Sequence, residues 1–80
     1  MYIVYILLSL KEPSKYYIGV TQDLEKRFKE HNNAKSGYAN RHIPWQIETF
    51  ITFKNKQLAQ RFEKYLKQGS GNAFLKKRLI

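Results

Sequence analysis

The feature that most constrains the fold is the apolar segment Tyr2–Leu8 near the start of the chain. It is rich in β-branched and aromatic residues and uncharged, which is typical of a strand buried on both faces. The segment is far too short to span a bilayer. No basic residue precedes it and no small-residue cleavage site follows it, so we expect no signal peptide. With 80 residues, the chain is expected to form one domain, 1–80.

Two further segments are expected to be strands. Lys11–Lys15 contains Pro and Ser and predicts a turn before a short strand at Tyr16–Val20. Two strands so close in sequence indicate a β-hairpin. A third strand is expected at Trp45–Phe53, where the residues largely alternate in polarity. The polar stretch Asn32–Pro44 is expected to be a loop.

Three segments have helical patterns. The first begins near Thr21, a plausible N-cap, and ends near Asn32; its inward residues are Leu24, Phe28 and His31. The second runs from about Lys56 to Lys67, with an apolar stripe of Leu58, Phe62, Tyr65 and Leu66. The third covers Ala73–Ile80, with Phe74, Leu75 and Leu79 facing inward. The expected class is therefore α/β (α+β), in the order β-β-α-β-α-α.

The composition restricts the possible functions. Lys and Arg number 15 against 6 Asp and Glu, a formal net charge of +9, and aromatic residues make up 15% of the chain. The aromatic content excludes a disordered basic tail. The absence of Cys excludes disulfides and thiolate zinc sites, and two His residues are too few for a histidine metal cluster. We expect a cytoplasmic protein with a polyanionic partner and no membrane association.

Most of the positive charge lies in the segment 54–78. It holds eight basic residues and one acid, a net charge of +7. We expect a phosphate-binding face there, although a solubilising surface would also explain the charge. Arg41, in the expected loop, is a further candidate. The candidates in the segment are Lys54, Lys56, Arg61, Lys64, Lys67, Lys76, Lys77 and Arg78.

A few residues have side chains suited to phosphate chemistry. Glu63 is the single acid of the basic segment; it could pair with a neighbouring Lys or Arg, or hold Mg²⁺ together with waters and phosphate oxygens. Arg27 and His31 stand one turn apart on the first helix. The arginine suits stabilisation of a phosphoryl transition state, and the histidine suits proton transfer. An exposed Arg and a half-buried His are the simpler alternative.

Two tyrosines complete the set. Tyr5 and Tyr17 lie in the two strands of the expected hairpin, so pairing would bring both hydroxyls to one face near Arg27. Core packing is the alternative for each. Gly19 lies at the junction of strand and helix, where a glycine indicates a bend or a close approach of another group.

This ordered set resembles the GIY-YIG nuclease family, in its short single-domain form. Tyr17-Ile18-Gly19 matches the second signature, and Ile3-Val4-Tyr5 matches the first with Ile3 in place of glycine. Arg27, His31 and Glu63 match the family's arginine, its histidine or tyrosine one turn later, and its metal-binding glutamate. Asn72 is a tentative match to an asparagine near the end of the domain. The resemblance covers nearly the whole chain.

The resemblance implies a three-stranded antiparallel sheet flanked by helices and a metal-dependent endonuclease that hydrolyses DNA, with a role in DNA repair. One divalent ion, Mg²⁺ or Mn²⁺, is implied on Glu63. A tyrosine, preferably Tyr5, would activate the attacking water, which requires Arg27 and other cations to lower its pKa. RNA stays open as a substrate, and we expect a monomer or weak homodimer. The alternative is a nucleic-acid-binding module of the same fold with little or no cleavage.

Overall fold

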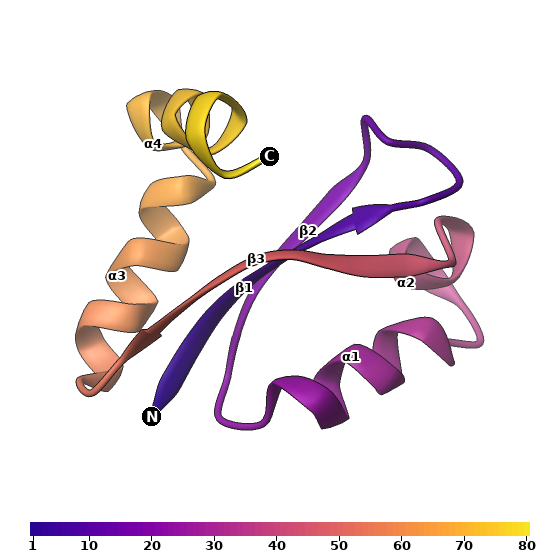
Figure 1. Ribbon diagram of the computed structural model, residues 1–80, viewed down its shortest axis with the longest axis horizontal. Coiled ribbons are helices and arrows are strands. Elements are labelled where there is room, and N and C mark those ends of the chain that lie inside the picture. The colour runs from indigo at the N-terminus through magenta and orange to yellow at the C-terminus, as the bar shows by residue number, and fades with distance from the viewer.

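A computed structural model describes residues 1–80. It contains a three-stranded antiparallel sheet, in the order β2-β1-β3, with helices on both sides (Figure 1). This confirms the expected α+β class. The strands are β1 (Tyr2–Ser9), β2 (Tyr16–Thr21) and β3 (Trp45–Phe53), and the helices are α1 (Leu24–Asn32), α2 (Gly37–Arg41), α3 (Lys56–Leu66) and α4 (Gly69–Phe74), followed by the π-helical turn η1 (Leu75–Leu79).

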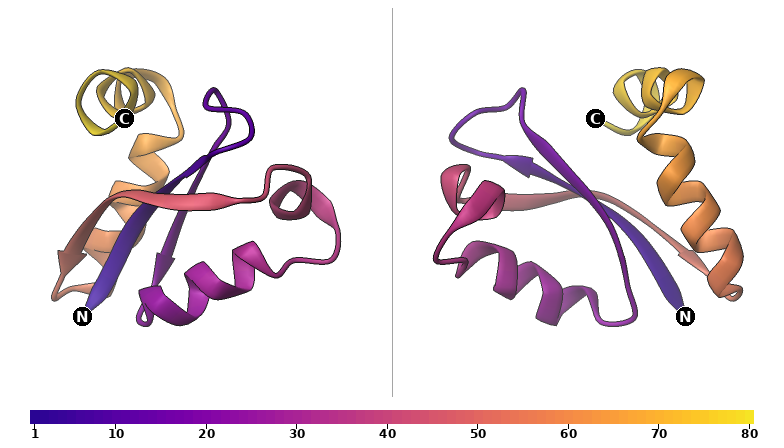
Figure 2. Two further views of the ribbon diagram at one scale, coloured as in Figure 1. Left: turned by 45° about the vertical axis from the view of Figure 1, so that its right-hand side comes forward. Right: turned by 180° about the vertical axis from the view of Figure 1, so that it is seen from behind.

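Strand β1 is the central strand, and its residues supply both cores. Val4 and Ile6 face a cluster completed by Ile18 of β2 and by residues of α3 and η1. Tyr5 and Leu7 face the opposite cluster, which includes Trp45 and is covered by α1. Since side chains alternate along a strand, one strand can supply two cores. Helices α1 and α3 consequently lie on opposite sides of the sheet (Figure 2).

The N-cap of the first helix lies two residues later than the sequence predicts. Its N-cap is Asp23, whose carboxylate accepts a hydrogen bond from the Lys26 N–H at 3.1 Å, and Thr21 was therefore the wrong assignment. Thr21 instead ends β2, and its hydroxyl accepts a hydrogen bond from the Asp23 N–H. Both residues are good caps in isolation. The paired strand extends through Thr21, which leaves Asp23 to cap the helix.

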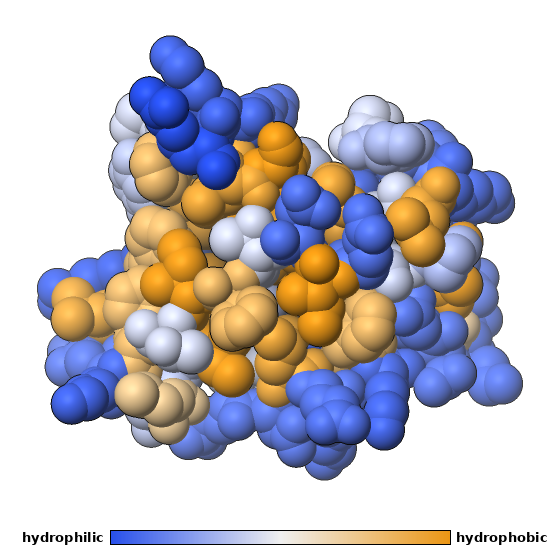
Figure 3. Space-filling view, in the orientation of Figure 1, coloured by the Kyte–Doolittle hydropathy of each residue, from blue (hydrophilic) through white to orange (hydrophobic).

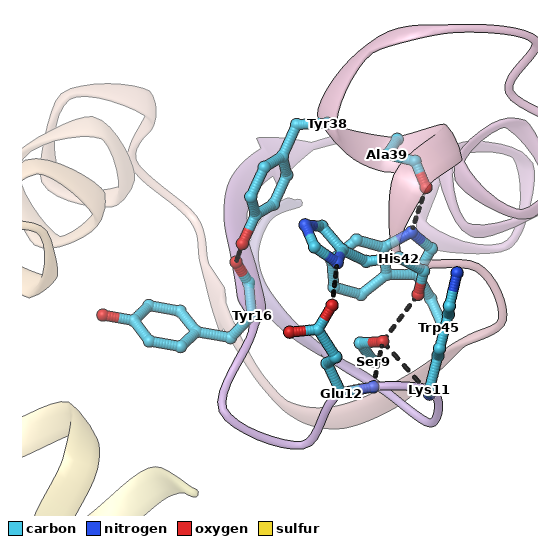
Figure 4. A network of polar contacts seen from close by, with 8 residues as sticks. All are labelled: Ser9, Lys11, Glu12, Tyr16, Tyr38, Ala39, His42 and Trp45. Atoms are coloured by element: carbon cyan, nitrogen blue, oxygen red, sulfur yellow. Dashed lines mark hydrogen bonds and ion pairs between the residues drawn. The ribbon is translucent and has the colours of Figure 1, made fainter.

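The polar stretch expected as a loop contains helix α2, so that prediction was wrong in part. The segment is held by side-chain to backbone hydrogen bonds (Figure 4). The indole N–H of Trp45 donates to the Ala39 carbonyl at 2.9 Å, and the Ser9 hydroxyl donates to the His42 carbonyl at 2.7 Å. The Asn32 side chain bonds both backbone groups of Trp45. Polar residues that look solvated in sequence are thus tied to the protein backbone.

The apolar stripe of α3 is rotated relative to its predicted position. Ala59 and Leu66 are fully buried, whereas Leu58 and Tyr65 are exposed by 50% and 45%. The small side chain of Ala59 allows the helix to pack closely on the sheet, which turns the neighbouring leucine outward.

The last helical segment begins at Gly69, four residues before the predicted start at Ala73. Gly71 packs against the backbone of Tyr65, where a Cβ would collide with the carbonyl oxygen. Leu75 is buried, but Phe74 is 39% exposed, contrary to the prediction. Close packing at the glycine therefore decides where α4 docks on α3.

The surface of β3 carries apolar side chains (Figure 3). Ile47 and Phe50 of this edge strand are both exposed, although Ile47 was expected to share a face with the half-buried Thr49, Ile51 and Phe53. The register between β1 and β3 shifts between Ile6 and Leu7, which breaks the alternation beside Ile47. None of the helices has the length and hydropathy needed to span a bilayer.

Candidate active site

Tyr5 and Gly19 face each other across the β1–β2 pair. A Cβ at position 19 would overlap the Tyr5 ring and its hydroxyl. The side chain of Tyr5 therefore crosses β2 through the space that the glycine leaves free. Because β2 is an edge strand, this path brings the hydroxyl from the central strand toward the border of the sheet.

Tyr5, Tyr17 and His31 form an aromatic cluster from β1, β2 and α1. The Tyr5 hydroxyl lies 3.1 Å from Nε2 of His31. The ring of Tyr17 stacks on Tyr5 with centroids 6.2 Å apart and lies 4.3 Å from the His31 ring centroid. The pairing of Leu7 with Tyr17 places both tyrosines on the α1 face. Hairpin formation thus brings together three of the residues singled out in the sequence.

The pKa of Tyr5 is raised well above the usual value for a tyrosine, first by burial and then by the neighbouring Tyr17. The positive charge of Arg27 acts in the opposite direction, while the charges of Glu63 and Glu30 add to the increase. From the sequence we expected Arg27 to lower this pKa, and its charge does act in that direction, but the net shift is upward. Burial of the phenol outweighs Arg27, so Tyr5 keeps its proton at neutral pH.

His31 has the opposite shift. Burial lowers its pKa, the charge of Arg27 lowers it further, and Glu30 partly opposes both. The imidazole is consequently neutral at pH 7. A neutral imidazole beside a protonated phenol provides a proton acceptor next to a proton donor.

Arg27 lies on α1 one turn before His31. Its guanidinium is about half exposed and approaches Glu30 at 3.6 Å, a weak surface contact. The side chain lines a groove between α1 and α3 and is near enough to the Tyr5 hydroxyl to affect its pKa. Arg27 thus offers a solvent-accessible cation beside the buried phenol.

Glu63 comes from α3, on the other side of the sheet. Its side chain is only 20% exposed, and Oε2 accepts a hydrogen bond from Nζ of Lys67 at 2.9 Å. Glu63 therefore forms an ion pair with a neighbouring basic residue, which was one of the two alternatives for it, and that residue is Lys67. The Glu63 charge also acts on the Tyr5 hydroxyl, as does that of Arg27. Arg27 and Glu63 thus come from opposite faces of the sheet, and the charges of both act on the Tyr5 hydroxyl.

The groove between α1 and α3 has a volume of about 450 Å³. Of the basic candidates from the sequence, Lys56 lines it, while Lys76 lines a different hollow beside Tyr16. The C-terminal cations therefore do not all serve one groove. Lys26, Gln22 and Gln60 also line the groove, and sequence reasoning did not single them out. The available signal was that Lys26 adjoins Arg27 on α1 and that Gln60 lies one turn before Glu63 on α3.

Asn72 contributes to packing between α4 and β2. Its side-chain amide donates to the Tyr16 hydroxyl at 2.9 Å and to the Leu66 carbonyl at 3.3 Å. It makes no contact with Tyr5, His31 or Glu63. The structure thus places Asn72 apart from the candidate site.

In this small α+β domain, the Tyr5 side chain crosses Gly19 of the hairpin. Arg27 and Glu63 come from opposite faces of the sheet, and together these features are typical of a nuclease domain. The family described as the GIY-YIG catalytic domain matches residues 1–78. The chain belongs to the GIY-YIG nuclease family.

Curated relatives include both a eukaryotic nuclease subunit and bacterial proteins. The chain is 38% identical over 68 residues to a structure-specific endonuclease subunit slx1 of Talaromyces marneffei, covering 78% of this chain and 18% of the relative. It is 38% identical over 53 residues to a UPF0213 protein of Vibrio campbellii, covering 65% and 51%. A UPF0213 protein of Clostridium perfringens is 40% identical over 70 residues, covering 86% and 73%. The chain thus spans about half or less of the first two relatives.

Proposed function

We propose that the protein is a metal-dependent endonuclease that hydrolyses DNA with structure-selective or weak sequence specificity. The observation that carries this proposal is the Tyr5 hydroxyl, held 3.1 Å from His31 and within the fields of Arg27 and Glu63. The name of the fungal relative, a structure-specific endonuclease subunit, supports an endonuclease that selects its substrate by structure. The proposal includes a cytoplasmic location, a monomeric or weakly dimeric state, and a role in DNA repair.

Tyr5 and His31 are proposed to move one proton. As the Tyr5 oxygen accepts a proton from the attacking water, its own proton passes to Nε2 of the neutral His31. The raised pKa of Tyr5 disfavours a free phenolate, and the lowered pKa of His31 keeps its imidazole neutral, so that Nε2 is free to accept the proton when the water donates its own. Tyr17 packs against both rings and holds their orientation.

Arg27 is proposed to stabilise the negative charge that develops on the phosphoryl oxygens. A guanidinium presents several donors in one plane and stays charged at every relevant pH. Its accessible position on the groove suits contact with a substrate phosphate. The ion pair with Glu30 is long enough to yield to that phosphate.

Glu63 fits the role of a single protein ligand for Mg²⁺ or Mn²⁺. Lys67 occupies Oε2, which leaves Oε1 for a cation, and no group of three ligating side chains forms a closed cage. Mg²⁺ commonly binds through one carboxylate together with waters and substrate phosphate oxygens. When bound, such an ion polarises the scissile phosphate and stabilises the leaving oxygen.

A binding module with little cleavage is the second candidate. It is favoured by the engagement of Glu63 with Lys67 and by the burial that holds the proton on Tyr5. Both features describe a site that needs substrate and metal to become active.

Cleavage of supercoiled plasmid and branched DNA separates the two candidates. With Mg²⁺ or Mn²⁺ the wild-type protein is expected to nick the DNA, and Arg27→Ala is expected to lose nicking while keeping its fold. Lys29→Ala on the same helix is the matched control, since Lys29 pairs only with the exposed Glu25. DNA binding without nicking by the wild type, or equal nicking by Arg27→Ala, would exclude the proposed enzyme.

A further inference from the structure

The groove between α1 and α3 extends beyond the proposed reaction centre. Arg27 belongs both to the groove and to the surroundings of Tyr5, which joins the two. On α3, the residues Lys56, Gln60 and Glu63 follow one another at helical spacing and share a face. Seven residues of α-helix rise about 10 Å. A phosphate held at Lys56 is therefore a different one from the phosphate held beside Glu63.

Two lysines from different helices line this groove. Lys26 comes from α1 and Lys56 from α3, and neither has a carboxylate within ion-pair distance. Of the two acids that line the groove, Asp23 caps α1 and Glu30 approaches Arg27, so neither is paired with Lys26 or Lys56. Two unpaired cations on separate helices therefore bracket a single hollow, which suits a phosphate group.

The remaining lining has the character of a nucleoside site. Gln22 and Gln60 provide amide donors and acceptors, one near each wall, and Tyr2 is a half-buried aromatic residue in the lining. Amides bond the edges of bases, and aromatic rings stack on their faces. A hollow of about 450 Å³ falls within the range of small-molecule sites.

We propose that this groove binds one unpaired nucleotide adjacent to the scissile phosphate. Lys26 and Lys56 hold its phosphate, Tyr2 stacks on its base, and Gln22 and Gln60 bond its edge. A base within a duplex is stacked and paired, so it cannot reach Tyr2 while its backbone lies on the lysines. This inference rests on the proposed function, and it explains how so small a domain could prefer a junction between single and double strands.

Binding without cleavage tests the groove separately from the nuclease. Two labelled DNAs are compared by fluorescence anisotropy in EDTA: a blunt duplex, and the same duplex with a five-nucleotide single-stranded extension. The variants are Lys26→Ala/Lys56→Ala and Tyr2→Leu. The control is Lys11→Ala/Lys35→Ala, which removes the same charge from exposed positions outside the groove.

The extended DNA is expected to bind wild type more tightly than the blunt one. The groove double variant should weaken extended DNA about tenfold more than the control does and reduce the slope of log K against log salt by about 0.7, because one single-strand phosphate loses its contacts. Tyr2→Leu should weaken it about tenfold through lost stacking. Blunt duplex should respond equally to the groove and control pairs.

Equal losses on both DNAs for the groove pair, or no preference for the extension in wild type, would overturn the proposal. The result is independent of catalysis. Groove-dependent binding of the extension by a protein that never cleaves DNA would refute the proposed nuclease and leave the groove assignment intact. Cleavage of DNA with no groove-dependent preference would refute the groove assignment and leave the proposed nuclease intact. Thermal unfolding checks that Tyr2→Leu is folded. Lys26 and Lys56 are exposed, so the lysine variants test the groove even if Tyr2→Leu does not fold.

Discussion

The side chain of Tyr5 lies across Gly19 of the neighbouring strand, in the space where any other residue would place its Cβ. This contact explains why the two motifs belong together. The glycine allows the tyrosine to cross the edge strand, and the tyrosine thereby brings its hydroxyl to His31. Because Gly19 has no side chain, the hydroxyl of the buried Tyr5 can reach His31.

Tyr5→Phe tests the hydroxyl. The ring packing is preserved, and His31 loses its partner at Nε2, so we expect the free energy of unfolding to fall by only about 1 kcal/mol. Cleavage should fall by roughly 100-fold or more, because the proposed proton transfer is lost. Plasmid nicking and thermal unfolding measure the two effects. Tyr38→Phe, which deletes a hydroxyl outside the site, is the control. Full activity in Tyr5→Phe, with loss in Tyr17→Phe, would transfer the role to Tyr17.

Gly19→Ala tests the crossing. The added methyl group overlaps the Tyr5 ring, so the tyrosine must shift, and overpacking of this kind costs about 1–3 kcal/mol. We expect lower stability and a loss of cleavage that exceeds the loss of folded protein. The double variant Gly19→Ala/Tyr5→Leu should recover most of the stability, because the shorter side chain leaves room for the methyl group. A failure to recover would mean that Gly19 is required for another reason.

Burial of the neutral His31 should make stability depend on pH. The folded-state pKa lies below the unfolded value of 6.5, so the unfolded chain binds more protons between the two values. The contribution to stability is complete above pH 6.5 and is lost as the pH falls through the folded-state pKa. Urea unfolding at pH 7.0 and 5.5 should show a drop in wild type and a smaller drop in His31→Gln. Equal drops would contradict the shift.

Asn72→Ala tests a structural role. The variant removes two hydrogen bonds, to the Tyr16 hydroxyl and the Leu66 carbonyl, and should destabilise the domain by about 1–2 kcal/mol. Cleavage per folded molecule should be unchanged, and Asn33→Ala, at an exposed position, should change neither quantity. Lost cleavage in a fully folded Asn72→Ala protein would return this residue to the active site.

The sequence was most informative where side-chain patterns are local. The strand Trp45–Phe53 was predicted with its observed bounds, and the apolar run at the start of the chain is indeed buried on both faces. Asp23 and Thr21 are both residue types that cap helices, and the length of the β1–β2 pairing decides between them. Likewise, the docking of α4 depends on Gly71 meeting Tyr65, a contact between two helices.

The candidate site could be predicted as a set of residues but not as an electrostatic environment. Tyr5, Tyr17 and His31 meet as hairpin pairing suggested. The direction of the Tyr5 pKa shift depends on how far the phenol is buried, which no sequence spacing reveals. Lys26 and Gln60 were missed because they are ordinary helix residues until the fold brings α1 and α3 to the same groove at the edge of the sheet.

Cleavage by Glu63→Gln, measured across a range of Mg²⁺ and Mn²⁺ concentrations, tests the central claim most directly. The amide keeps the shape of the side chain and removes the charge, and Glu25→Gln on the exposed face of α1 is the matched control. Glu63→Gln is expected to bind DNA at least as tightly as wild type, because an acid is lost among cations, yet to nick it at least 100-fold more slowly at every metal concentration. Wild-type nicking by Glu63→Gln would contradict that claim.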